Sequence, residues 1–187
     1  MLKNSVMKAT VAALILSGSV HGETLLGWDF VDNAANAVSA TASIVAENLN
    51  LSSITRGPGL AASAYSDNGQ TFGSSHWNNS TFDAEDYYTF PVEPSSSFAV
   101  MSLEQITLSL FEQNNPAMTM ELQWATDPSS FGAGNPNTSG AFAVSSGNTS
   151  FTVYNIDLSG ETELQDTNEM WEFRLYGWEQ GFYESAG

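Results

Sequence analysis

The chain has 187 residues, with 4 lysines and arginines against 21 aspartates and glutamates and no cysteine. This length fits one domain, and a formal net charge of −17 repels phosphate backbones and anionic lipid, which excludes nucleic-acid binding. The lack of cysteine also excludes disulfide scaffolds, thiolate zinc sites and cysteine nucleophiles.

Residues 1–22 have the three parts of a secretory signal. Two lysines precede the apolar run 9–16, and small residues follow at 17–22, which predicts cleavage before Glu23. The apolar run is shorter than the roughly 20 residues that a bilayer requires. We therefore expect bacterial export to the cell surface or the extracellular medium, and a mature domain, 23–187, without a membrane span.

After residue 22, short segments with a two-residue apolar period alternate with turn-forming segments, and no window shows a helical period. This spacing indicates about eight or nine strands. In chain order we expect strands at 24–31, 41–46, 60–66, 86–92, 105–111, 118–124, 149–158 and 171–175.

The two clearest strands are 105–111 and 118–124. In the first, Ile106, Leu108 and Leu110 alternate with polar residues, and the second repeats this alternation with outward positions at Thr119 and Gln123. The connection between them, Glu112-Gln113-Asn114-Asn115-Pro116, has turn chemistry, which predicts a hairpin.

Strands with this spacing pack best as two antiparallel sheets around one core. We predict an all-β, jelly-roll-like two-sheet sandwich. Residues 125–140 are long for a hairpin connection and carry no periodic pattern, so we expect a surface loop there.

Six short strings suggest a family. In order they resemble the secreted β-sandwich modules of bacterial PEP-CTERM proteins, which are sorted by exosortase. The resemblance covers most of residues 24–178 and implies an exported sandwich without supplying an activity or a catalytic motif. The strings are GWDF at 27–30, ITRGPGL at 54–60, HWN at 76–78, DYYTF at 86–90, DPSSF at 127–131 and FRLYGW at 173–178.

Proteins of that kind usually continue with a further strand and a sorting tail, which the sequence to Gly187 does not contain. The resemblance therefore leaves two interpretations. One is a protein released from the cell. The other is a chain that lacks its last strand, whose exposed neighbour would pair with another chain.

Catalytic side chains are scarce. Without residues 1–22 the chain has no lysine and one histidine, His76, and neither Gly-x-Ser-x-Gly nor His-Glu-x-x-His occurs. Carboxylates are present in number, and a pair across a groove can hydrolyse a glycosidic bond. Solvated outward acids are the simpler interpretation, since no spacing singles out a pair. The candidates on or beside predicted strands are Glu104, Glu112, Glu121 and Glu172.

Calcium is the metal that suits an exported, acid-rich, cysteine-free sandwich, because it takes oxygen ligands from irregular loops. The densest acid cluster is Asp83, Glu85 and Asp86, and 157–166 offers a second. Neither follows the EF-hand spacing, and ordinary turn chemistry is the alternative to a calcium site.

The aromatic residues suggest a binding site. Tyr87 and Tyr88 are adjacent, so a strand there points one ring outward. Flat rings stack on sugar faces while amides bind hydroxyl groups, which predicts a glycan platform, with isolated surface rings as the alternative. Its members are Trp77, Asn78, Tyr87 and Tyr88.

The two arginines that remain after residue 22 have predicted structural roles. We expect Arg174 to pair with a carboxylate on a neighbouring strand. Arg56 precedes Gly57-Pro58-Gly59 and is expected to bind free backbone carbonyls.

The leading hypothesis is a non-catalytic exported sandwich that binds polysaccharide or associates with itself at the cell surface or in the matrix. The alternative is a carbohydrate-active hydrolase or lyase built from carboxylates and tyrosine. That alternative requires a cleft with two carboxyl groups roughly 5 to 10 Å apart.

Overall fold

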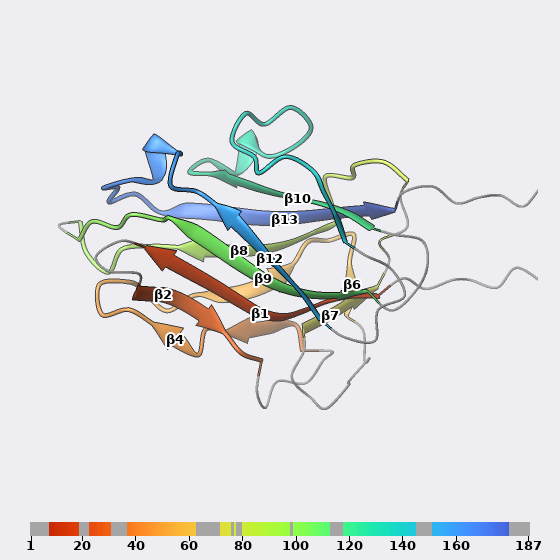
Figure 1. Ribbon diagram of the computed structural model, residues 1–187, viewed down its shortest axis with the longest axis horizontal. Coiled ribbons are helices and arrows are strands. Elements are labelled where there is room, and N and C mark those ends of the chain that lie inside the picture. Colours follow the sequence, from red (N-terminus) through yellow and green to blue (C-terminus); the bar gives the residue numbers. More distant parts are fainter. Residues whose placement is uncertain are drawn as a thin grey trace, which may run out of the picture.

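The computed structural model describes residues 8–18, 23–30, 37–62, 72–75, 77, 80–97, 99–112, 118–144 and 151–179. Two antiparallel sheets pack face to face over one apolar core (Figure 1), which confirms the predicted all-β two-sheet sandwich. The helical elements of the described residues are two 3₁₀ turns, η1 (Pro128–Ser130) and η2 (Thr162–Leu164). Among the described residues there is no helix with the length and hydropathy of a membrane span.

The first sheet joins seven of the described strands. Five follow the order β12-β9-β1-β2-β4, while β7 pairs with β1 and β6 pairs with β7. The central strand β1 comes from the N-terminal run that has the pattern of a secretory signal. The strands are β1 (Lys8–Gly18), β2 (Glu23–Trp28), β4 (Ile44–Val45), β6 (Ala61–Ala62), β7 (Phe72–Ser75), β9 (Gln105–Glu112) and β12 (Thr152–Asp157).

The second sheet has six described strands in the order β11-β10-β13-β8-β5-β3. At its centre β10 and β13 pair from Met118 opposite Glu179 to Ala125 opposite Glu172. The strands are β3 (Ser39–Thr41), β5 (Ser53–Arg56), β8 (Tyr87–Val92), β10 (Met118–Ala125), β11 (Phe142–Val144) and β13 (Trp171–Glu179).

Most of the predicted strands are present with shifted ends. The strand expected at 41–46 is divided into β3 and β4, and of the segment 60–66 the structure describes 60–62, with β6. The alternation did not indicate β7, because all four of its residues are buried, including Gly73 and Ser74. A strand buried on both faces has no two-residue period to detect.

The predicted hairpin between 105–111 and 118–124 is wrong. β9 pairs with β1 and β12 in the first sheet, whereas β10 pairs with β11 and β13 in the second. Each strand presents an apolar row to the shared core, with Leu108 and Leu122 at most 1% exposed. A turn-forming connection serves a crossing between sheets as well as a hairpin, so the local pattern did not distinguish them.

The outer face of β10 is more enclosed than predicted. Gln123 is 1% exposed, because the loop 125–140 folds back over it. Its side-chain oxygen accepts the N–H of Gly132 at 3.1 Å, and its amide nitrogen donates to the Gly132 carbonyl at 3.1 Å. The buried amide is thereby satisfied at both ends. The loop lies on the surface as expected, but it also seals part of the second sheet.

Arg56 and Arg174 both bind other groups of the same domain. Arg56 donates to the carbonyl of Gly73 from Nε at 3.2 Å and from Nη2 at 2.6 Å, so it binds a backbone carbonyl as predicted, but one on β7 and not in the turn 57–59. Arg174 Nε lies 2.7 Å from Glu172 Oε1 on the same strand, so the predicted cross-strand partner is wrong. Residues two apart on one strand share a face, which makes this pairing possible.

Candidate functional site

The predicted glycan platform is not assembled on the surface. Trp77 and Tyr88 are both 0% exposed, and their rings meet edge to face at 5.4 Å inside the core. The Tyr88 hydroxyl donates to the carbonyl of Phe72 at 3.2 Å, and burial raises the pKa of Tyr88. Neither ring offers a face to a ligand.

The alternation predicted one outward ring in the tyrosine pair, and in the structure Tyr87 is that ring. Its ring is half-buried and stacks beneath the guanidinium of Arg174, 4.5 Å from the ring centre. The same guanidinium lies 4.1 Å from the centre of the Phe131 ring. Tyr87 therefore belongs to a packed cation–π arrangement. The predicted partner Asn78 lies outside the described residues.

The predicted calcium ligands do not converge. Asp83 Oδ1 accepts the backbone N–H of Glu85 at 2.8 Å, as in an ordinary Asx turn. Glu85 is exposed, whereas Asp86 is buried against Gly59. No group of three or more acidic, histidine or cysteine side chains in the described ranges is arranged to hold a metal ion.

A hollow of about 320 Å³ lies instead beside β10, β11 and β12. β11 is an edge strand of the second sheet and β12 an edge strand of the first. The rings of Phe142 and Tyr154 approach to 5.3 Å across these edges. We call this the edge hollow, and its lining residues are Trp124, Thr138, Ser139, Phe142, Tyr154, Asn155, Ile156, Asp157 and Glu161.

Local hydrogen bonds fix the walls of the edge hollow. Ser139 donates its backbone N–H to the Leu122 carbonyl at 2.9 Å and accepts the Leu122 N–H on its hydroxyl at 3.1 Å. On β12 the side chain of Asn155 is also fixed, because the Thr107 hydroxyl donates to Asn155 Oδ1 at 2.9 Å. These bonds hold Ser139 against β10 and Asn155 against β9.

Three aromatic side chains line the edge hollow. Trp124 is 1% exposed, and its Nε1 donates to Glu163 Oε1 at 3.1 Å, so the indole belongs to the core. Phe142 and Tyr154 are half-buried and inclined by 37° to each other, which leaves part of each ring accessible. An apolar surface beside several oxygen acceptors is the usual composition of a site for a polar organic ligand.

Two carboxyl residues, Asp157 and Glu161, line the edge hollow. The hydroxyl of Ser159 donates to Asp157 Oδ1 at 2.7 Å and the Ser159 backbone N–H at 2.9 Å, and these bonds lower the pKa of Asp157. Asp157 is therefore ionised at neutral pH. None of the lining residues is basic.

The glutamates selected on predicted strands do not line the edge hollow. Glu121 accepts from the amide of Gln123 at 2.8 Å, and Glu172 pairs with Arg174. The backbone carbonyl of Glu104 accepts the Leu158 N–H at 2.7 Å, and the side chain of Glu112 lies outside the described residues.

The sequence analysis did not predict the aromatic pair of the edge hollow. Phe142 and Tyr154 are far apart in sequence, and their proximity depends on which two strands become sheet edges. The acid cluster 157–166 was the one local signal, since Asp157 and Glu161 belong to it.

No family model, curated protein or solved structure matches this chain.

Proposed function

We propose that the protein is an exported, non-catalytic β-sandwich that binds polysaccharide at the cell surface or in the extracellular matrix through the edge hollow. The observation that carries this proposal is the Phe142–Tyr154 ring pair beside oxygen-bearing side chains from β12 and from neighbouring loops. The signal pattern of residues 1–22 supports export. The resemblance to secreted sandwich modules of PEP-CTERM proteins agrees with it.

The lining residues suit a sugar ring. The inclined faces of Phe142 and Tyr154 provide apolar contact for the C–H face of a pyranose. The Ser139 hydroxyl donates its proton to the Gly140 carbonyl at 2.8 Å, so it is not a free donor. The Thr138 hydroxyl can donate and the carboxylate of Asp157 accepts, so these lining residues can bind sugar hydroxyls.

Charge narrows the class of polysaccharide. The edge hollow contains two carboxyl residues and no basic one, and the whole chain has a formal net charge of −17. A sulfated or uronate-rich polymer would meet repulsion both in the hollow and from the surrounding surface. The expected ligand is therefore a neutral polysaccharide or one that carries amino groups.

The test compares binding of a panel of neutral, amino-bearing and sulfated polysaccharides by isothermal titration calorimetry. Tyr154→Leu removes the ring but keeps apolar volume, and Val153→Ala is the matched control, since Val153 is 59% exposed and does not line the hollow. Loss of ring contact worth about 1 kcal/mol predicts roughly fivefold weaker binding for Tyr154→Leu. Equal affinities for the wild type and both variants would overturn the assignment of the hollow.

A hydrolase is the second candidate, favoured by the presence of Asp157 and Glu161 in one hollow. A glycosidase needs one carboxylic acid and one carboxylate flanking the bond. Assays for new reducing ends on the same panel distinguish the candidates. If the protein releases new reducing ends and either Glu161→Gln or Asp157→Asn abolishes this release, hydrolysis replaces binding as the proposed function. Binding without release of reducing ends supports the non-catalytic proposal.

A further inference from the structure

We propose that the edge hollow selects a polysaccharide that carries free amino groups over a neutral one. This inference rests on the proposed function, since it names the chemical class of the same ligand. Three features of the hollow support it, namely the charge of its lining residues, an available carboxylate oxygen and a pair of accessible rings.

The charge of the lining residues favours a cation. The two charged residues of the edge hollow, Asp157 and Glu161, are both acidic. A hollow of about 320 Å³ is about 8 Å across, which is shorter than the Debye length of about 10 Å at 0.1 M salt. A cation bound in it therefore interacts with both residues, and the formal net charge of −17 adds to the attraction. A neutral sugar gains nothing from this field.

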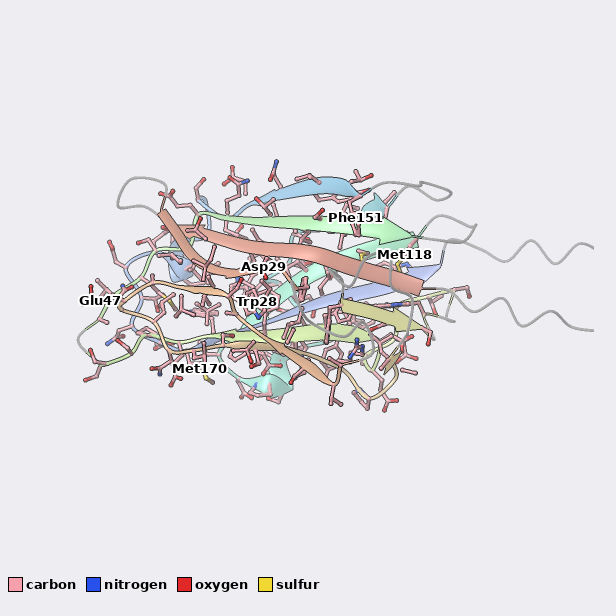
Figure 2. All side chains as sticks on the ribbon, turned by 90° about the horizontal axis from the view of Figure 1, so that it is seen from below. Trp28, Asp29, Glu47, Met118, Phe151 and Met170 are labelled. Carbon is pink, nitrogen blue, oxygen red and sulfur yellow. The ribbon has the colours of Figure 1, made fainter. Side chains whose placement is uncertain are left out.

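β12 brings an acidic residue and a ring to the edge of the first sheet. Figure 2 shows β12 as the outermost described strand of that sheet, alongside β9. Tyr154 lies in the middle of β12 and Asp157 is its last residue, so about 10 Å of extended strand separate them. A ligand that contacts both residues therefore extends along β12, as a chain of sugar units does.

Asp157 has an oxygen available for a charged donor. Both bonds from Ser159 end on Asp157 Oδ1, and no donor among the described residues bonds Oδ2. An ammonium group has three donors and no acceptor, so it matches a carboxylate oxygen, which only accepts. A sugar hydroxyl can donate to the same oxygen, but it lacks the Coulomb attraction that a cation adds.

The rings of Phe142 and Tyr154 also attract a cation. The face of an aromatic ring binds an ammonium group within about 6 Å of the ring centre. The two ring centres lie 5.3 Å apart, so a cation beside one ring is also close to the other. The fold already uses this contact elsewhere, since the Arg174 guanidinium lies 4.5 Å from the centre of the Tyr87 ring. The rings therefore bind the apolar face of any sugar and add a preference for one with an amino group.

The test uses two oligosaccharides that differ in one group. A hexamer of glucosamine carries a free amino group on each unit, and the fully N-acetylated hexamer has the same backbone without the charge. Isothermal titration calorimetry measures both affinities at low salt, at a pH at which the amino groups are protonated. We expect the free-amine hexamer to bind about three- to thirtyfold tighter, which is the combined gain from a cation–π contact and an exposed ion pair. Higher salt should lower this ratio.

Two carboxyl variants and a matched control locate the selectivity. Asp157→Asn and Glu161→Gln each remove one charge from the edge hollow, and each should lower the affinity ratio by about two- to fivefold. The amide introduced by Asp157→Asn still accepts the bonds from Ser159, so the local turn is kept. Glu169→Gln removes the same charge from an exposed residue that does not line the hollow, so it should keep the ratio of the wild type.

Two results would overturn this inference and leave the proposed function in place. The wild type could bind both hexamers equally and Tyr154→Leu could weaken both, which would mean that the hollow binds sugar without selecting charge. Glu169→Gln could lower the ratio as much as Asp157→Asn, which would assign the preference to the net charge of the protein. If neither hexamer nor any polysaccharide of the panel binds, the inference and the proposed function are both overturned.

Discussion

Gly177→Ala tests whether the core around Trp77 is as tightly packed as the structure indicates. A Cβ at Gly177 would lie 2.8 Å from Cε3 and Cζ3 of Trp77 and 2.9 Å from Cε of Met118. Ordinary contacts of a Cβ begin at about 3.4 Å, so the ring must move by roughly half an ångström. Trp77 is fully buried and meets Tyr88 at 5.4 Å, which leaves it little room.

Overpacking of this kind costs about 1 to 3 kcal/mol. The lower backbone entropy of alanine in the unfolded chain returns up to about 1 kcal/mol. Three contacts below 3.0 Å place the cost at Gly177 in the upper part of that range, about 2 to 3 kcal/mol. The expected net loss in the free energy of unfolding is therefore about 1 to 2 kcal/mol, or roughly 2 to 8 °C in Tm for a chain of this size.

Urea unfolding and calorimetry measure this loss against a matched control, Gly160→Ala. A Cβ at Gly160 meets nothing within 4 Å, so that variant should unfold like the wild type within about 0.5 kcal/mol. In a Trp77→Phe background, where the benzo part of the indole is absent, the cost of Gly177→Ala should fall by about 1 kcal/mol. Equal stabilities of the two alanine variants would refute the packing argument.

Two further predictions concern titrating groups. Burial raises the pKa of Tyr88, so its contribution to stability is present below the unfolded pKa of about 10 and is lost as the pH rises through the folded pKa. Urea unfolding from pH 8 to 11 should therefore show a steeper loss for the wild type than for Tyr88→Phe, and identical slopes would contradict the burial effect. The hydroxyl and backbone N–H of Ser159 lower the pKa of Asp157, which gives stability above the unfolded pKa that is lost on acidification. Ser159→Ala removes the hydroxyl bond and keeps the backbone N–H bond, so it should raise the Asp157 titration midpoint in NMR part of the way towards its ordinary value of about 3.9. An unchanged midpoint would show that the hydroxyl bond does not form in solution.

The sequence predicted which side chains face the core better than it predicted which strands pair with each other. The alternation of Ile106, Leu108 and Leu110 identified the inward row of β9, because burial of one face leaves a period of two in the residues themselves. It did not identify the partner strands, because pairing depends on chain segments outside the local pattern. Gln123 shows the same limit, since its burial comes from a loop that folds back from Gly132.

The candidate site was less predictable than the fold. The tyrosine pair correctly indicated one inward and one outward ring, but Tyr88 proved to be the inward one and Tyr87 is held by Arg174. Composition can show that aromatic and acidic side chains are available. It cannot show that Phe142 and Tyr154 meet, because that contact exists only after two separate sheets have placed their edges side by side.

The position of the edge hollow has a mechanical consequence. Because β11 and β12 belong to different sheets, a sugar chain bound in the edge hollow would contact both sheets at once. Ligand that binds only the closed sandwich stabilises it by about 2.7 kcal/mol at a hundredfold excess over Kd. A polysaccharide bound by many copies of the protein would therefore make the two sheets of each copy harder to separate.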